Sequence, residues 1–178
     1  YLARALIFLA MRKDPVLERR SIRRYTGKDV DEKDVRKVLE AAMAAPSAGN
    51  ERPWHFVVLR DRKLLEGVMD VHPYAQMLRQ SPVAVLVCGD PSLEKYKGFW
   101  VQDCAAATEN MLIMATQLGL GAVWLGIYPI EERVQGLRLL LSIPQDAVPF
   151  ALVPLGHPDE AKRPVDRYDD SRVHRDGW

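Results

Sequence analysis

Residues 99–118 read FWVQDCAAATENMLIMATQL, and this stretch decides the fold class more than any other. Its polar side chains recur about every seven residues, so an α-helix gathers them on one narrow stripe. They are Gln102, Asp103, Glu109, Asn110, Thr116 and Gln117. Gly119 follows and is a good helix terminator. A helix that is apolar around most of its girth lies at the centre of a domain or against a partner chain.

Four other segments predict β-strands, because they are rich in β-branched and aromatic residues. They are 54–59, 83–87, 122–127 and 150–155. The run at 83–87 is apolar throughout, which is typical of a strand buried on both faces. Further helices are expected after Asp14-Pro15, after a capping Asp31, and at 63–71, 74–80 and 130–141. This alternation predicts a three-layer α/β/α sandwich with several parallel strand pairings.

The composition is that of a globular domain. The 178 residues are 48% hydrophobic and 28% charged, which excludes a disordered chain. The 25 basic and 24 acidic residues give a net charge of +1, so no overall field gathers nucleic acid or an anionic membrane. Any anion site must be local. The two cysteines, Cys88 and Cys104, form no CxxC pair, which argues against a zinc site and favours a reducing compartment.

The two ends of the chain differ from its middle. Residues 2–11 form an apolar run that is too short to cross a bilayer and lacks the flanks of a signal peptide. We expect a short helix there, on the surface or against a partner chain, and a cytoplasmic protein. Residues 157–178 are highly charged and aperiodic, which fits a disordered tail or an arm across another subunit. The expected division is 1–13, 14–156 and 157–178.

Several common motifs are absent or misplaced. Gly119, Gly121 and Gly126 lie between a helix end and a strand start, the reverse of the order that a dinucleotide fingerprint requires. The sequence has no P-loop and no GxSxG motif. Its four histidines are far apart and form no HExxH pair, so no metal site is expected. The two cysteines fall in an expected strand and helix, where a small core residue is more common than a nucleophile.

The densest chemical signal is a cluster of four arginines. Arg19, Arg20, Arg23 and Arg24 surround Ser21. An isolated cluster of this kind indicates a solvated basic face or a kinase recognition site, but the neighbouring isoleucine and tyrosine favour burial. If the segment is extended, alternate residues place two guanidinium groups and a hydroxyl on one side. That arrangement suits a phosphate and its polar neighbours.

A second signal is the loop at 46–54, which reads PSAGNERPW. Its small side chains let the backbone approach a flat ligand closely. Asn50 can both donate and accept hydrogen bonds, which matches the edge of a heterocycle. Taken alone, the loop is as well explained by a structural role.

Together the two signals resemble the nitroreductase family of flavoproteins. The matching pieces are RRSIR at 19–23, APSAGN with PW and F at 45–56, GLGAVWLG at 119–126 and PFALVPLGHP at 149–158. The tail pieces DRYD at 166–169 and RVH at 172–174 are similar to the family's closing segment. The resemblance covers 14–178, in order and at the right spacing, although each piece alone is weak.

The resemblance implies an α+β fold with a central mixed sheet, in an intertwined homodimer that holds FMN at the subunit interface. It implies that Arg19, Arg20, Ser21 and Arg23 contact the phosphate, the ribityl chain and the pyrimidine edge of FMN. Arg167 would reach the phosphate from the tail, with Arg163 and Arg172 as alternatives. The tail would be an arm that wraps the partner subunit.

Two further segments are implied to touch the flavin ring. One comes from the other subunit and lies against the isoalloxazine, through Pro46, Ser47, Ala48 and Asn50. The family usually has a second serine where this chain has Ala48, so a hydroxyl contact is lost there. The other segment faces the ring near its reactive centre, through Trp124, Leu125 and Gly126.

The activity implied by the resemblance is that of an FMN-dependent NAD(P)H oxidoreductase. Hydride would pass from NAD(P)H through flavin N5 to a nitroaromatic or quinone-like acceptor, in ping-pong order. Arg23 is our candidate for the cation that stabilises negative charge at flavin N1. The flavin carries the chemistry, so no catalytic side chain is expected. The alternatives are reductive dehalogenation, ene reduction or flavin reduction on the same scaffold, and a flavin-binding protein without turnover.

Overall fold

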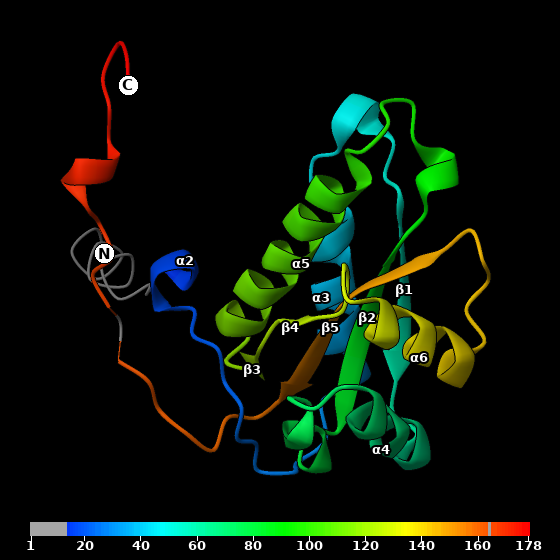
Figure 1. The fold of residues 1–178 in the computed structure, drawn as a ribbon. Helices are drawn as coiled ribbons and strands as arrows, with labels where there is room; N and C mark the ends of the chain where they lie inside the picture. Colours follow the sequence, from blue (N-terminus) through cyan, green and yellow to red (C-terminus); the bar gives the residue numbers. More distant parts are fainter. Residues whose placement is uncertain (1–13, 164) are drawn as a thin grey trace.

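A computed structural model describes residues 14–163 and 165–178, so the helix expected within 1–13 lies outside the described residues. The strands form one sheet in the order β1–β2–β5–β3, and β4 also pairs with β5 (Figure 1). The strands are β1 Trp54–Leu59, β2 Val83–Gly89, β3 Gly121–Ala122, β4 Leu125–Gly126 and β5 Val148–Gly156. β5 therefore lies at the centre of the sheet and contacts three other strands.

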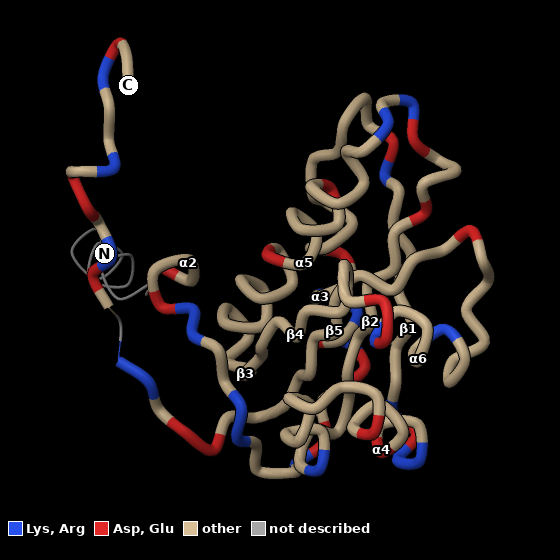
Figure 2. The backbone as a smooth tube through the Cα atoms, in the orientation of Figure 1, with Lys and Arg blue, Asp and Glu red and all other residues tan. Residues whose placement is uncertain are grey.

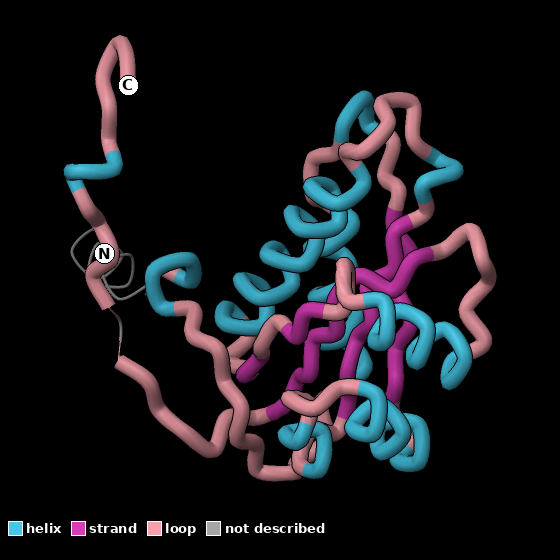
Figure 3. Tube along the Cα trace, viewed as in Figure 1, coloured by secondary structure: helices cyan, strands magenta, loops and turns pink. Residues whose placement is uncertain are grey.

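Five described α-helices accompany the sheet. They are α2 Pro15–Glu18, α3 Glu32–Met43, α4 Arg62–Val71, α5 Trp100–Gln117 and α6 Glu131–Leu141. Short 3-10 turns are η1 Ala48–Asn50, η2 Gln76–Arg79, η3 Pro91–Leu93 and η4 Asp170–Arg172. The strands form the middle layer, with helices on both sides (Figure 3). The expected α+β, three-layer architecture is confirmed.

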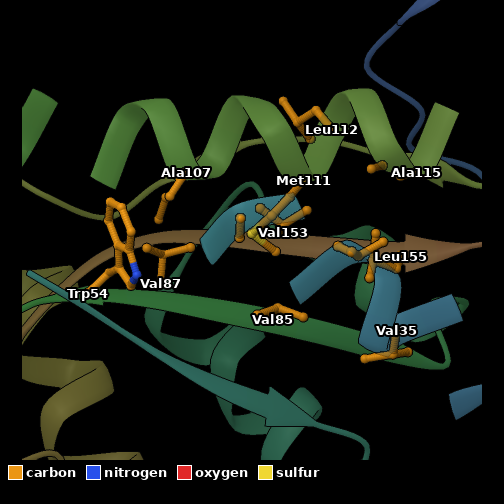
Figure 4. Close-up of a cluster of buried hydrophobic side chains, with 14 of the residues drawn as sticks. Val35, Trp54, Val85, Val87, Ala107, Met111, Leu112, Ala115, Val153 and Leu155 are labelled. Carbon is orange, nitrogen blue, oxygen red and sulfur yellow. The ribbon is translucent and has the colours of Figure 1, made fainter. Parts of the chain in front are cut away.

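The two faces of the sheet are covered by different helix pairs. Alternate residues of β2 point to opposite faces. Val83, Val85 and Val87 pack toward α3 and α5, whereas Ala84, Leu86 and Cys88 belong to the second cluster, with residues of α4 and α6. Figure 4 shows Met111 of α5 among Val153, Val85 and Val87 in the first cluster. Both faces of β2 are buried, as its continuous apolar run predicts.

The expectation of parallel pairings between the strands was wrong. The four strand pairs β1–β2, β2–β5, β3–β5 and β4–β5 are all antiparallel. An intervening helix does not fix the relative direction of two strands. Here α4 and η2 return the chain to the end of the sheet that it left after β1, so β2 runs back along β1. The parallel pairing that the described residues contain is a single bridge between Ser21 and Ala122.

Three local expectations also needed correction. Asp31 precedes α3 but makes no side-chain capping bond, and its carboxylate instead lies 3.1 Å from the Lys33 ammonium group. The helix expected at 74–80 is the single turn η2. The strand expected at 122–127 is broken into β3 and β4, with Val123 and Trp124 between them. By contrast, Asp14 does cap α2 by accepting from the Val16 N–H at 2.9 Å.

The segment after β5 first runs along the N-terminal part of the described chain. Pro158 forms an antiparallel bridge with Tyr25, and the Asp159 N–H donates to the Arg24 carbonyl at 2.9 Å. Figure 2 shows the charged residues of both segments near one another. Beyond 164 the chain leaves the sheet, and its side chains are exposed. Within the described ranges, no helix has the length and apolar character needed to span a membrane.

Candidate functional site

The arginine segment lies beside the edge of the sheet. Ser21 bridges to Ala122 of β3, and the Ile22 N–H donates to the Ala122 carbonyl at 2.9 Å. Arg19 turns toward α5, where its Nε lies 3.1 Å from Oε1 of Glu109. Ser21 is half-buried, and the Arg23 side chain is exposed. The extended backbone expected for this segment is therefore anchored to the strand that leads into 124–126.

The Arg20 guanidinium group is held by backbone carbonyls, but one of its nitrogen atoms has no hydrogen-bond partner among the described residues. Its Nε donates to the Arg163 carbonyl at 3.0 Å, and its Nη1 donates to the Leu17 carbonyl at 2.9 Å. Its Nη2 is buried and has no hydrogen-bond partner within the described part of the chain. A buried donor without a partner is costly. A phosphate oxygen would satisfy this atom, so the donor set beside Ser21 fits an anion.

The sequence did not reveal how the residues after 157 hold the arginine segment. Lys162 Nζ donates to the Ser21 carbonyl at 2.5 Å. The Glu160 carboxylate accepts from the Arg23 N–H at 2.5 Å and lies 3.3 Å from Lys162. The Arg23 N–H, followed by Lys162, holds the pKa of Glu160 below its usual range, against the effect of burial. These contacts join residues more than 130 positions apart, which no local pattern signals.

The three tail arginines lie at different distances along the chain from the arginine segment, and none of their side chains makes a hydrogen bond or ion pair to residues 19–23 in the described structure. The Arg163 backbone lies against Arg20. Arg172 Nε pairs with Asp169 at 3.1 Å within the exposed η4 turn. Arg167 lies in the exposed stretch after 164 and makes no hydrogen bond or ion pair to the described residues 19–23.

The segment 124–126, called the floor below, includes strand β4, which pairs with β5. Trp124 packs edge-to-face on Phe150, with 5.8 Å between ring centroids, and Leu125 is buried. Gly126 is half-buried, yet a Cβ built there would meet no atom within 4 Å. The Gly126 carbonyl accepts from His72 Nε2 at 3.1 Å and from Arg133 Nη1 at 2.7 Å. The space at the Gly126 Cα is therefore open, and another molecule can approach the backbone closely there.

The loop 46–50 is fixed by side chains on neighbouring segments. The Ala48 N–H donates to Asp103 Oδ1 at 3.1 Å, and Ser47 Oγ accepts from the Arg52 N–H at 2.9 Å. Gly49 and Asn50 have φ values of 52° and 56°, in the left-handed region. A Cβ at Gly49 would lie 2.7 Å from the Tyr96 ring, so both the positive φ and this close approach favour glycine at the position. Pro46 and Asn50 are exposed, which leaves the loop's outer surface free for a ligand.

One chain does not bring the arginine segment and this loop together. Asp103, which holds the loop, lies in the first turn of α5, and Ala122, which holds Ser21, follows its last turn. A helix of 18 residues is about 27 Å long. In Figure 1 the loop lies at the upper end of α5 and the arginine segment passes its lower end. Among the described residues, no hydrogen bond or ion pair joins 46–50 to 19–23.

Other reactive groups in the described chain are not organised as catalysts. Burial raises the pKa of both the Cys88 and the Cys104 thiol to about 12, so neither is a ready nucleophile. No group of three or more histidine, cysteine or acidic side chains is placed to hold a metal ion in the described ranges. Burial, followed by the charge of Arg133, lowers the pKa of His72. His72 is therefore a neutral hydrogen-bonding residue, whose role the sequence did not reveal.

The domain is thus a three-layer α+β fold, with the arginine segment and Gly126 at one edge of its sheet. Comparison with known proteins defines the class further. The sequence profile of the nitroreductase family matches residues 16–71 and 68–157. The chain therefore belongs to the nitroreductase family.

Three comparisons illustrate the relationship. The chain is 51% identical over 165 residues to a Methanothermobacter thermautotrophicus protein named "Putative NADH dehydrogenase/NAD(P)H nitroreductase", covering 93% of this chain and 86% of the relative. It superposes on a "putative nitroreductase in complex with fmn" from Desulfovibrio desulfuricans with a TM-score of 0.79 and 32% identity, covering 93% and 99% of the two chains. It also superposes on an "FMN-dependent Nitroreductase" from Clostridium difficile with a TM-score of 0.86 and 25% identity, covering 93% and 99%.

Proposed function

We propose that this protein is a cytoplasmic, FMN-dependent oxidoreductase that takes hydride from NAD(P)H and delivers it to a nitroaromatic or quinone-like acceptor. The observation that carries the proposal is the unpartnered, buried Nη2 of Arg20, next to Ser21 and at the sheet edge that leads to Gly126. Family membership supports the choice of FMN as the ligand for this donor. The two buried, free cysteines agree with a reducing compartment.

The residues present fit FMN. Arg19, Arg20, Ser21 and Arg23 would bind the phosphate, ribityl chain and pyrimidine edge, with help from Arg167 or another tail arginine. The floor at Trp124, Leu125 and Gly126 would carry the ring, because the space above Gly126 is open and backbone can approach closely there.

The second wall of the site would come from another copy of the chain. The loop with Pro46, Ser47, Ala48 and Asn50 lies at the opposite end of α5 from the arginine segment, with Pro46 and Asn50 exposed and Ser47 and Ala48 half-buried. A two-fold homodimer with α5 helices side by side and antiparallel would bring the loop of one subunit to the arginines of the other. We propose that the exposed residues after 164 form an arm on the partner. The exposed Val16 and Leu17 of α2 give such a dimer additional apolar surface to bury.

FMN, when bound, supplies two-electron chemistry at its N5 atom. This chain's side chains have other tasks. The arginines neutralise the phosphate, Asp103 fixes the loop through the Ala48 N–H, and Trp124 packs on Phe150 to shape the floor. None of these groups has to move a proton, so we assign no catalytic side chain.

The kinetic order tests this proposal. If NAD(P)H and the acceptor use the same floor at 124–126, the oxidised dinucleotide must leave before the acceptor enters. Initial rates at several fixed acceptor concentrations should then give parallel double-reciprocal lines. Intersecting lines would mean two separate sites. Absence of NAD(P)H oxidation with nitroaromatics, quinones, free flavin and halogenated phenols, in a protein that holds FMN, would favour a flavin-binding protein without turnover.

A further inference from the structure

The Gly126 carbonyl is held by two donors that come from two different helices. His72 follows the last residue of α4, and Arg133 lies in the first part of α6. His72 Nε2 lies 3.1 Å and Arg133 Nη1 lies 2.7 Å from the same oxygen. A carbonyl oxygen has two lone pairs, so these two contacts fill its accepting capacity.

The tautomer of His72 follows from its two contacts. The Tyr74 N–H donates to Nδ1 at 3.2 Å, so Nδ1 carries no proton. Nε2 faces a carbonyl, which only accepts, so Nε2 carries the proton. His72 is 1% exposed, and both burial and the neighbouring Arg133 disfavour a second proton. The ring is therefore a fixed, neutral donor to Gly126.

Arg133 is also held in place. Its guanidinium carbon lies 5.8 Å from the centroid of the Tyr74 ring, within the range of a cation–π contact. His72 and Tyr74 in turn contact each other edge-on, with 6.2 Å between their rings. The three side chains form one unit, the His72–Tyr74–Arg133 unit, against the outer edge of β4.

The unit acts on the edge of β4 that faces away from β5. In an extended strand the N–H and C=O of one residue point to the same side. The Gly126 carbonyl points toward His72 and Arg133, so its N–H also points to this edge rather than to β5. The empty space at the Gly126 Cα lies at the same residue. A ligand on this floor meets a peptide whose orientation and charge are set by the two donors.

We propose that His72 and Arg133 are positioning residues that fix the Gly126 peptide, and that they raise the two-electron reduction potential of a flavin bound against it. The inference rests on the proposed function. Without the donors, the partial negative charge of the Gly126 oxygen is uncompensated, one residue's width from the open space proposed for the ring. Reduced flavin gains negative charge, so the loss of either donor disfavours the reduced form more than the oxidised form.

The test is spectroelectrochemical titration of the flavin-loaded protein and its variants. Arg133→Gln should lower the potential by about 30 mV, which corresponds to a tenfold loss in the preference for reduced over oxidised flavin. Arg133→Lys keeps the charge and should recover most of that shift. Arg79→Gln, an exposed arginine in the η2 turn, is the matched control and should leave the potential unchanged.

A second pair of variants covers the case in which Arg133→Gln does not fold. His72→Phe removes one donor and should also lower the potential, whereas His72→Gln, with an amide that donates and accepts, should restore it. A potential that stays at the wild-type value in the donor-deleting variants overturns the inference while leaving the proposed function intact. A wild-type protein that binds no flavin overturns both.

Discussion

The Asp103 carboxylate accepts a hydrogen bond from the Ala48 N–H at 3.1 Å, and this contact ties the loop 46–50 to the first turn of α5. Asp103 is 5% exposed, and its Oδ2 has no partner among the described residues. Burial raises the pKa of this carboxyl, against the Ala48 N–H, and the charges of Glu51 and Glu94 add to the increase. Burial of the Asp103 carboxylate therefore costs stability, while the same carboxylate holds the Ala48 N–H in place.

Asp103→Asn should stabilise the protein at neutral pH. The folded-state pKa of Asp103 lies above its ordinary value of 3.8, so the folded state binds more protons and the free energy of unfolding falls as the pH rises through this window. Asn keeps an acceptor for Ala48 and removes the charge. We expect a gain of about 1 kcal/mol at pH 7, the scale of one buried polar group without a partner.

Urea unfolding measures this gain in the free energy of unfolding. The Asp103→Asn variant and the wild type are compared between pH 4 and pH 8, at about one measurement per pH unit. The gain should shrink toward the acidic end, because a growing fraction of the wild-type carboxyl binds a proton there. Asp103→Ala, which loses the acceptor, should be less stable than Asp103→Asn. A wild type that is more stable than Asp103→Asn across the whole range would contradict the account of this carboxyl.

Gly126→Ala should distinguish an effect on flavin binding from an effect on the stability of the fold. A Cβ at Gly126 meets no atom within 4 Å, so the variant should unfold at the wild-type urea concentration in the absence of flavin. The added methyl group fills the space proposed for the ring, so the FMN dissociation constant should rise about tenfold, or about 1.4 kcal/mol. Fluorescence titration with FMN measures the change.

The matched control for that variant is Gly121→Ala. Its Cβ would lie 2.6 Å from Cγ2 of Ile22, so this variant should lose stability without flavin. If the two alanine variants lose FMN affinity and stability in equal measure, the floor assignment at Gly126 fails.

The arginines should differ in what they contribute. Arg20→Ala removes the buried Nη2 and should weaken FMN binding by about tenfold to a hundredfold, the value of one charge-assisted hydrogen bond. Arg23→Ala should weaken binding and also lower the flavin potential, if Arg23 is the cation near N1. Arg36→Ala removes an exposed arginine paired with Glu40 on α3 and is the control. Equal potentials in the Arg20 and Arg23 variants would refute the role given to Arg23.

The arm is best tested by ending the chain after residue 163. This cut keeps the contacts of Asp159, Glu160 and Lys162 with the arginine segment, so a loss cannot be attributed to them. We expect the shortened chain to lose both dimer and flavin, because the two are one linked equilibrium in the proposed assembly. Sedimentation with absorbance detection of flavin measures both. A shortened chain that remains a flavin-loaded dimer would make the arm dispensable.

Much of the fold could be predicted from local patterns. The strand Trp54–Leu59 is confirmed at both ends, because an aromatic and β-branched run is bounded there by residues that interrupt it. The central helix is confirmed to within one residue at each end. Strand direction could not be predicted in this way. It depends on how α4 and η2 turn back beside the sheet, and periodicity carries no information about that.

Some residues of the candidate site could likewise be found from local sequence patterns, and others could not. The arginine segment is recognisable by its clustered arginines, and the loop 46–50 by its small side chains. His72 did not, because its contact with Gly126 spans 54 positions and a single buried histidine resembles any other core residue. Asp103 offered a usable signal, an acidic residue in the first turn of a helix that is mostly apolar. Its partner could be found only after folding, when Ala48 lies 55 positions away in sequence and beside it in space.

The identity of the bound cofactor tests the central claim most directly. The protein should be purified without added flavin, incubated with equal amounts of FMN and FAD, freed of unbound ligand by gel filtration, and denatured by heat. Chromatography of the released material should yield FMN, close to one per chain, because the buried donor of Arg20 and its neighbours suit a terminal phosphate. Release of FAD, or of no flavin from a folded protein, would contradict the account.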